Sequence, residues 1–380
     1  MKQIASDVVI VGGGIMGSSA ALFLRQRGLS VTLLERDLIG QHASGTNFGN
    51  VRRQGRPLYQ LPLANRASAI WRRAKELLDT DVEYIQGGHM RVCYRDRSEM
   101  VERMESYARD AKELGLELEL LSAPAIHKRF PFLGPEVLAG SYSALDGHAN
   151  PRLVSPAFAR AAQRLGARIE ENTRIILVEK VGEDFQVLSE AGTVYTAPNV
   201  LITTGAWGNE LASQFRETAP LTSFGPNMSV TEPVPYCIKP SVGVFTTEEK
   251  ETVYFRQIER GNVIIGGSTR APGFPNTCRT HVRPQNTLSQ LQQIRRLAPG
   301  LGQLRLIRVW SGTEGYLPDW QPIMGPSAVA AGLYYAFGFS GAGFQIGPGV
   351  GETMAELIAS GQTSIDLEPY RPSRFSPEVG

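Results

Sequence analysis

The sequence predicts an α/β fold, and three observations near the N-terminus support this prediction. Residues 8–11 are a run of β-branched side chains, which is typical of a strand buried on both faces. Residues 12–17, GGGIMG, follow this run and lead into a helical segment that ends near Gly28. Residues 31–34 then form a second apolar run. We expect this strand, helix and strand to begin a Rossmann-like sheet of parallel strands.

The glycines of the first turn fit the pattern G-x-G-x-x-G at Gly12, Gly14 and Gly17. The first glycine permits a tight turn, the second lets backbone approach a pyrophosphate, and the third lets the helix pack close to the strand. The helix N-terminus offers unpaired N–H groups to the phosphates. Glu35, about 20 residues further on, is placed to accept hydrogen bonds from ribose hydroxyls. This unit predicts a dinucleotide site for FAD or NAD rather than NADP.

Composition excludes several classes of function. The chain has 380 residues, enough for two domains, and a formal net charge of +2 that gives no reason to expect nucleic acid as a partner. The three cysteines Cys93, Cys237 and Cys278 form no C-x-x-C, so we predict neither a sequence-local metal site nor a disulfide framework. No apolar stretch approaches the ~18 residues of a membrane span. Residues 1–6 leave no room for a signal peptide, and we expect a cytoplasmic enzyme.

The hydrophobic pattern along the rest of the chain predicts a mixture of helices and strands. We expect helices at 63–78, 98–114, 155–166, 284–297 and 349–360, with an irregular, proline-punctuated segment at 122–135. We expect strands at 87–94, 167–170, 173–180, 200–205, 252–256, 262–267 and 332–337. The C-terminal helix follows the glycine-rich stretch GFSGAGFQIGPGVGE, so a glycine-rich turn precedes a helix at both ends of the chain. We therefore expect both ends to converge on one ligand.

The segment 36–57 is rich in Gly, Ser, Asn and Arg and is predicted to be a loop. Its small residues let backbone and hydroxyl groups approach a phosphate or a flavin ring. Arg52 and Arg53 lie within it. A guanidinium group matches a carboxylate bidentately, so one of the two is expected to bind an amino-acid substrate, the alternative being a surface salt bridge.

These segments together resemble the D-amino acid oxidase superfamily of flavoproteins, nearest to the sarcosine oxidase and glycine oxidase branch. The matching pieces occur in the family's order over nearly the whole chain: VVIVGGGIMGSSAALFL with Glu35, ASGTNFGNVRR, GHANPRL, VLITTGAWGNEL, the Leu-Pro-Asp segment and GFSGAGFQIGPGVGETMAELI. The resemblance implies a discontinuous FAD-binding domain and a substrate domain with a mostly antiparallel sheet. We assign 1–82, 145–215 and 309–380 to the first domain, and 83–144 and 216–308 to the second.

The motifs and the resemblance also predict which residues bind FAD. In monomeric sarcosine oxidase a cysteine before the Pro-Asp pair carries the flavin, whereas this chain has Ser-Gly-Thr-Glu at 311–314 and no cysteine after Cys278. FAD is therefore expected to be noncovalent. The predicted cofactor-binding residues are Gly12, Gly14, Ile15, Met16, Gly17, Glu35, Arg36, Ser44, Gly45, Thr46, Asn47, Gly49, Asn50, Thr204, Gly205, Trp207, Gly312, Gly341, Gly343, Phe344 and Gln345.

Two departures from the family pattern bear on the reaction. The oxidase has a lysine and a histidine where this chain has Ile264 and Ser268, and losing a cation beside the flavin weakens the reaction with oxygen, which favours a dehydrogenase. Gln345 replaces a lysine that helps to bind the substrate carboxylate. Carboxylate binding is then expected from Arg52, Arg53 or Arg256, with help from Gln345. Tyr254 is our candidate for an aromatic hydroxyl over the substrate.

The resemblance implies oxidation of the C–N bond of a secondary or D-amino acid to an imine by hydride transfer to flavin N5. D-Hydroxyproline, D-proline, sarcosine and opines are the expected kinds of substrate. The pattern resembles the β-type subunits of multi-subunit dehydrogenases, which implies partner redox subunits as electron acceptors. Two alternatives stay open: an FAD-dependent 2-hydroxy acid or glycerol 3-phosphate dehydrogenase, and a non-catalytic FAD-binding subunit.

Overall fold

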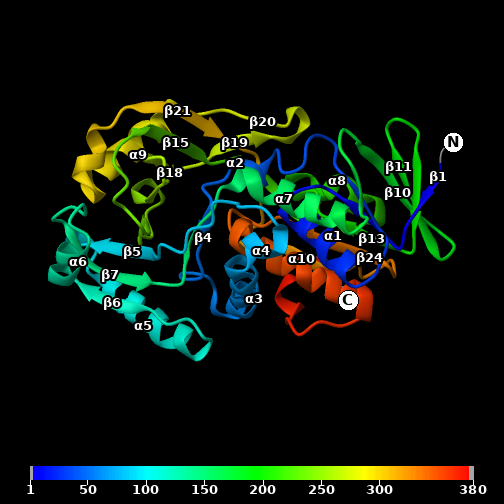
Figure 1. The fold of residues 1–380 in the computed structure, drawn as a ribbon, viewed down its shortest axis with the longest axis horizontal. Helices are drawn as coiled ribbons and strands as arrows, with labels where there is room; N and C mark the ends of the chain where they lie inside the picture. Colours follow the sequence, from blue (N-terminus) through cyan, green and yellow to red (C-terminus); the bar gives the residue numbers. More distant parts are fainter. Residues whose placement is uncertain (1–2, 376–380) are drawn as a thin grey trace.

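The computed structural model describes residues 3–375 and contains two large sheets, one in each half of the molecule (Figure 1). The first sheet has six strands in the order β23-β24-β13-β2-β3-β9. All neighbours in it are parallel except β23 and β24, which pair antiparallel at the edge. The predicted Rossmann-like sheet is therefore confirmed. Its strands are β2 Val8–Val11, β3 Val31–Leu34, β9 Arg168–Glu170, β13 Asn199–Ile202, β23 Ile323–Pro326 and β24 Leu333–Phe337.

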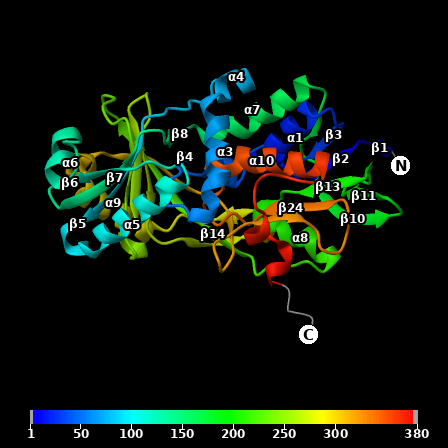
Figure 2. The same cartoon turned by 90° about the horizontal axis from the view of Figure 1, so that it is seen from below.

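The parallel sheet is covered on both faces, as its β-branched strands predict. Val8 and Ile10 pack with the helices of one face, whereas Val9 and Val11 pack against a small four-stranded sheet on the other. The helices are α1 Ile15–Gln26, α3 Leu61–Arg72, α7 Pro151–Arg164 and α10 Gly343–Ser360, which lie together in Figure 2. The small sheet comprises β1 Gln3–Ala5, β10 Ile175–Val181, β11 Asp184–Ser189 and β12 Val194–Ala197.

The second large sheet has eight strands in the order β21-β15-β18-β17-β16-β5-β7-β6. All of its neighbours pair antiparallel except β16 and β5, so the prediction of a mostly antiparallel sheet is confirmed. Its strands are β5 His89–Tyr94, β6 Glu119–Ser122, β7 Val137–Ser143, β15 Asn227–Pro233, β16 Ser241–Val244, β17 Val253–Gln257, β18 Asn262–Gly267 and β21 Leu306–Ser311. The helices near it are α5 Glu99–Glu113, α6 Ala123–Arg129 and α9 Pro284–Leu297.

Short elements lie between the two large sheets. A two-stranded sheet joins β4 Asn50–Val51 to β8 Gly147–His148, and β4 and α3 occupy the middle of the molecule in both views (Figures 1 and 2). A further four-stranded sheet is formed by β14 Thr222–Gly225, β19 Ala271–Phe274, β20 Arg279–Thr280 and β22 Glu314–Tyr316.

The strand β21 runs across the domain boundary expected after residue 308, and the domain assignment stays a prediction. Within residues 3–375 no helix is both long and apolar enough to cross a membrane.

Three predicted elements need correction. The helix expected at 63–78 is two helices, α3 and α4 Ala74–Leu78, and the segment 122–135 contains the helix α6. The C-terminal helix α10 begins at Gly343, six residues earlier than expected. Packing explains the early start, because Cβ atoms at Gly347 and Gly351 would lie 2.6 Å from Ile15 Cγ2 and 2.1 Å from Ser19 Oγ of α1. The glycine-rich run is thus the contact surface between α10 and α1.

Candidate active site

A cavity of about 550 Å³ lies where the two large sheets meet. The carboxyl ends of the parallel strands β2 and β13 and the glycine turn before α10 line one side of it. The strands β5, β16 and β17 and the short strand β22 line the other. Both glycine-rich turns therefore converge on this cavity, as the sequence predicted.

The first glycine turn is shaped for close approach. Gly12 has φ +110°, and a Cβ there would lie 2.6 Å from the Thr203 carbonyl oxygen. A Cβ at Gly17 would lie 2.0 Å from the Gly12 carbonyl oxygen, so this glycine holds α1 against the turn rather than facing the cavity. The buried Glu35 accepts hydrogen bonds from the backbone N–H of Gly13 at 2.7 Å and of Asp37 at 2.9 Å. Its carboxylate is thereby fixed beside the turn.

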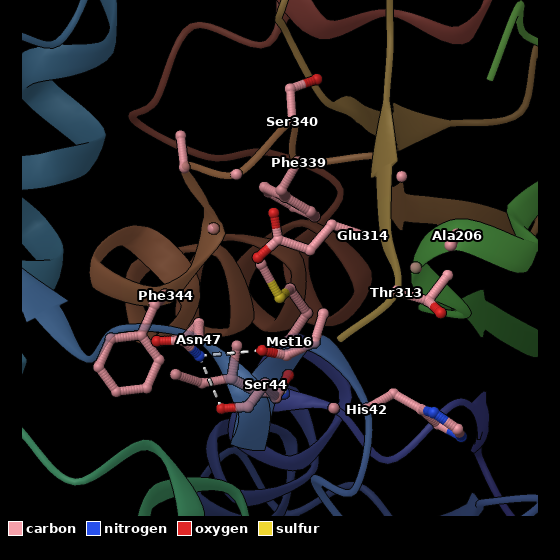
Figure 3. A pocket seen from close by; sticks show the side chains of 18 of the residues that line it. Met16, His42, Ser44, Asn47, Ala206, Thr313, Glu314, Phe339, Ser340 and Phe344 are labelled. Atoms are coloured by element: carbon pink, nitrogen blue, oxygen red, sulfur yellow. Dashed lines mark hydrogen bonds between the residues drawn. The ribbon is translucent and has the colours of Figure 1, made fainter. Parts of the chain in front are cut away.

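The loop after β3 supports the same turn. Ser44 Oγ accepts the backbone N–H of Ile15 at 2.9 Å and so satisfies one of the free donors at the start of α1. Asn47 Nδ2 donates to the carbonyl oxygens of Ala43 and Ser44, both at 2.9 Å, and Asn47 Oδ1 accepts the N–H of Gly49 at 2.7 Å. Figure 3 shows Met16, Ser44 and Asn47 together at this side of the pocket.

Several buried polar atoms near the first glycine turn have no hydrogen-bond partner in the part of the chain that the structure describes. They are Arg36 Nη2, Thr204 Oγ1 and Thr313 Oγ1. Arg36 also stacks on Trp207, with its guanidinium carbon 3.8 Å from the ring centroid. Buried polar groups are normally hydrogen-bonded, so unpartnered donors and hydroxyls beside a glycine turn and a helix N-terminus fit a bound dinucleotide.

Most of the predicted cofactor residues line this cavity, and four do not. Those that line it are Gly12, Gly14, Ile15, Met16, Glu35, Arg36, Ser44, Asn47, Gly49, Asn50, Thr204, Gly205, Trp207, Gly341, Gly343, Phe344 and Gln345. Gly17, Gly45, Thr46 and Gly312 lie behind the lining. Gly312 is needed for packing, because a Cβ there would lie 1.9 Å from Thr46 Oγ1.

Arginine side chains form the positive end of the cavity. Arg52 lines it together with Arg56 and Arg91, neither of which was predicted from the sequence. Burial, together with the nearby charge of Arg52, lowers the pKa of Arg56 and of Arg91 to about 9. Arg56 lies in the same arginine-rich segment as Arg52, NVRRQGR, and this clustering was an available signal, whereas Arg91 in the strand HMRVCY offered none.

Two predicted substrate residues have other partners. The side chain of Arg53 is buried and pairs with Asp146 at 3.3 Å, and the Arg53 backbone N–H donates to the same carboxylate at 2.9 Å. Arg256 donates to the carbonyl oxygen of Phe48 at 2.7 Å and lies 3.3 Å from His148 Nδ1. Neither arginine lines the cavity, which corrects the prediction that they face the substrate. Both hold the loop at 48–54 in place.

Gln345 is also engaged elsewhere. Its side-chain Nε2 donates to the carbonyl oxygen of Ala64 in α3 at 2.9 Å, and its own backbone carbonyl oxygen accepts the Trp71 indole N–H at 2.7 Å. The residue is 1% exposed, and its Oε1 has no hydrogen-bond partner among residues 3–375. The structure therefore places Gln345 as a link between α10 and α3, and its amide nitrogen is not available to a substrate carboxylate.

The cavity also contains an acid and two tyrosines. Tyr316 donates its hydroxyl to Glu314 at 2.5 Å, and Arg270 Nε donates to the Tyr316 oxygen at 3.1 Å. Burial raises the pKa of Glu314, and Tyr316 and Arg270 oppose that shift. Tyr254 lines the same wall, packs edge-on against Phe48 with ring centroids 4.7 Å apart, and has its pKa raised by burial to about 12. Glu314 and Phe339 project into the pocket in Figure 3.

Comparison with known proteins agrees with this geometry. The family described as FAD dependent oxidoreductase matches residues 7–357. The chain belongs to this family. Glycine oxidase from Geobacillus kaustophilus (strain HTA426) is 26% identical over 383 residues, which cover 98% of each chain. An opine oxidase subunit from Rhizobium meliloti is 28% identical over 386 residues, which cover 97% of each chain. The crystal structure of L-proline dehydrogenase from P. horikoshii superposes with a TM-score of 0.91 at 26% identity, covering 99% of this chain and 98% of that one.

Family membership confirms that FAD is the cofactor and that the chain is an oxidoreductase acting on CH–NH bonds. The Gly12–Gly17 turn, Glu35 and the Arg36–Trp207 stack would hold its nucleotide half. The turn at 341–344 and the loop at 44–50 would hold the flavin ring of FAD. The arginines and Glu314 then remain for the substrate.

Proposed function

We propose that this protein is a dehydrogenase that oxidises the C–N bond of a secondary or D-amino acid to an imine. One observation carries the proposal: the cavity contains three arginines that have no acidic partner among the described residues, and it also contains the carboxylate of Glu314. A substrate with a carboxylate and an amine is complementary to that arrangement. The names of relatives support it, since they include an opine oxidase and a proline dehydrogenase.

The residues of the chain have distinct roles in this scheme. Arg52 and Arg56 bind the substrate carboxylate and so orient the α-carbon. Glu314 accepts the proton of the substrate ammonium group, because the nitrogen lone pair must be free to form the C=N bond as the α-carbon loses its hydrogen. Tyr254 and Tyr316 stay protonated at neutral pH because burial raises the pKa of both hydroxyls. FAD, when bound beside these residues, would supply the acceptor for the hydride equivalent that leaves the α-carbon.

A substrate panel under anaerobic conditions tests the reaction class. The holoenzyme would be mixed separately with sarcosine, D- and L-proline, hydroxyproline and opines, and with 2-hydroxy acids and glycerol 3-phosphate, while the flavin absorbance is recorded. We expect amines to bleach the flavin and hydroxy acids to leave it oxidised. Bleaching by hydroxy acids alone would overturn the proposal, and no bleaching by any compound would favour a non-catalytic FAD-binding subunit.

We further infer that the electrons pass to a partner redox subunit rather than to oxygen, in a cytoplasmic complex. Ile264 on β18 is 8% exposed and packs with Phe48 and Met228, so no cation is available at this position, and no lysine lines the cavity within residues 3–375. The opine oxidase relative supports a multi-subunit arrangement, since its name describes one subunit of an oxidase. The test reduces the isolated holoenzyme anaerobically and compares its reoxidation by dissolved oxygen with that by an artificial dye. Rapid peroxide formation would contradict the inference.

A further inference from the structure

The positive end of the cavity holds more charge than one substrate carboxylate requires. Arg52 and Arg56 come from the loop after β4, and Arg91 comes from β5. Within residues 3–375 none of the three forms a salt bridge, whereas their neighbour Arg53 does. Burying cations without partners is costly, so an external anion is expected to neutralise them.

Arg91 and Arg52 lie close to each other. Both approach Gly55, where a Cβ would be 2.1 Å from Arg91 Nη1 and 3.3 Å from Arg52 Nη1. Gly55 has φ +75°, so a side chain is disfavoured there on conformational grounds as well. The glycine leaves room for the two guanidinium groups to face one region of the cavity.

The hydrogen bonds of the three guanidinium groups differ. Arg56 donates to the carbonyl oxygens of Arg52 at 3.2 Å and Ala342 at 3.1 Å and to Gln60 Oε1 at 2.6 Å, and is thus held in position. Arg52 Nη1 donates to the carbonyl oxygen of Gln54. The side chain of Arg91 has no hydrogen bond among the described residues, and its guanidinium carbon lies 4.3 Å from the centroid of the Phe245 ring. The planar fork of Arg91 is therefore free to bind a ligand.

No group of the described chain compensates this charge. Asp146, whose field reaches Arg52 and Arg56, already accepts bonds from the Arg53 side chain and from the backbone N–H groups of Arg53 and Gln54. His89 lines the cavity but has its pKa lowered well below the ordinary value by burial and by the neighbouring arginines. It is neutral and cannot serve as a counter-ion.

Arg91 belongs to the substrate side of the cavity. Its strand β5 pairs in parallel with β16, where Arg91 is the partner of Gly243, another residue of the lining. The predicted FAD contacts come instead from the turns at the parallel sheet and from the loop at 36–50. We therefore do not expect a negatively charged group of FAD to pair with Arg91.

We propose that the substrate is a dicarboxylic secondary amine, with one carboxylate bound by Arg52 and Arg56 and the second bound by Arg91. This rests on the proposed amine oxidation. A guanidinium group matches a carboxylate through two parallel hydrogen bonds, and Arg91 is the one arginine of the three with its donors free. Arg91 is therefore a specificity-determining residue for the second acidic group.

The test compares each dicarboxylate with its own monoamide. The substrates are iminodiacetate, N-(2-carboxyethyl)glycine and N-(3-carboxypropyl)glycine, which vary the distance between the carboxylates, and the readout is anaerobic flavin reduction by the holoenzyme. For the best-fitting member we expect kcat/KM to exceed that of its monoamide by about 10- to 100-fold, the range of a charge-assisted hydrogen bond. The Arg91→Gln variant should lose most of this preference, and Arg91→Lys should keep part of it.

The control is Arg95→Gln, which removes an exposed arginine just beyond the end of the same strand, outside the lining. It should keep the wild-type preference. Binding without turnover gives an independent readout: oxydiacetate should shift the flavin spectrum at lower concentration than methoxyacetate, and Arg91→Gln should abolish the difference. Equal rates with dicarboxylates and monoamides would overturn the inference while leaving amine oxidation intact. Failure of every amine to reduce the flavin would instead overturn the proposed function.

Discussion

Arg52 and Arg53 are neighbours in the chain but lie in different environments. Arg52 lines the cavity, and Arg53 is buried against Asp146 behind it. Because a strand or extended loop directs successive side chains to opposite sides, adjacency in sequence does not give the two arginines one role. Their substitution should therefore give opposite phenotypes.

Arg53→Gln is expected to lower the free energy of unfolding by about 3–5 kcal/mol, because it leaves Asp146 buried without its cation. Arg52→Gln is expected to change stability little and to lower kcat/KM for the amine by about 100-fold, since it removes a charged contact with the carboxylate. Urea unfolding and steady-state kinetics check both values. The double variant Arg53→Gln/Asp146→Asn should recover part of the lost stability. An Arg53→Gln protein that is stable but binds substrate weakly would show that Arg53, and not Arg52, binds the substrate.

Glu314 gives a prediction that depends on pH. Burial raises its pKa above the unfolded value, so its contribution to stability is present in full below the unfolded pKa and is lost as pH rises through the folded pKa. Glu314→Gln removes this loss. We expect the melting temperature of the variant, relative to that of the wild type, to increase as the pH rises from about pH 4 to about pH 8.

The same substitution should reduce catalysis. The wild-type kcat/KM should fall as pH decreases through the raised pKa of Glu314, because the protonated acid cannot accept the proton of the amine. Glu314→Gln should remove that acidic limb and lower the plateau. A variant with an unchanged pH profile would show that another group accepts the proton.

Among the elements, the pair α1 and α10 joins the two glycine-rich turns. Gly351 of α10 lies against α1, where an added Cβ would be 2.1 Å from Ser19 Oγ and 2.6 Å from the backbone nitrogen of Ala20. Ser19 Oγ also lies 3.3 Å from the carbonyl oxygen of Gly347. The position of one turn relative to the other thus depends on the close packing of two helices.

Gly351→Ala is expected to destabilise the protein by about 1–3 kcal/mol, because overpacking forces the two helices apart. Thermal unfolding with and without added FAD measures the effect, and weaker FAD binding should accompany the loss. Gly300→Ala is the matched control, since nothing lies within 4 Å of a Cβ built there. Equal melting temperatures for the two variants would mean that α1 and α10 separate without cost.

In the whole molecule, the cavity joins the parallel sheet to the antiparallel sheet. Neither half contains the full site, because the nucleotide-binding turns belong to one sheet and Arg91 and Tyr254 to the other. A ligand that bridges both halves stabilises the folded chain by mass action. FAD should therefore raise the melting temperature in a concentration-dependent way.

We also predict that the flavin is released on denaturation. None of the cysteines Cys93, Cys237 and Cys278 lines the cavity, and Gly312 stands beside Thr46 in the segment where the related enzyme has its flavin-bearing cysteine. Acid precipitation of the holoenzyme should leave the yellow colour in the supernatant. Flavin fluorescence that stays with the protein pellet or with the band on a denaturing gel would disprove noncovalent binding.

Local patterns were sufficient for much of this structure. The β-branched run at 8–11, the glycines of the first turn and the acid at Glu35 predicted a strand, a tight turn and a ribose contact within one continuous segment. The strands at 252–256 and 262–267 and the helix at 284–297 follow from periodicity and proline position, and β17, β18 and α9 agree with them closely. Each of these signals acts over a few residues, so the sequence contains it completely.

The partners of individual side chains depended on residues far away in the chain. Arg256 donates a hydrogen bond to the carbonyl group of Phe48, and Gln345 donates one to the carbonyl group of Ala64. The guanidinium group of Arg91 remains available to a ligand because the strand β5 places it in the cavity beside Arg52. The sequence alone determined the class of fold and the dinucleotide turn, because short-range backbone geometry encodes them, and the resemblance of its ordered motifs to a flavoprotein family indicated FAD. Only the tertiary structure decided which arginines face the substrate, because that depends on how two sheets pack around one cavity.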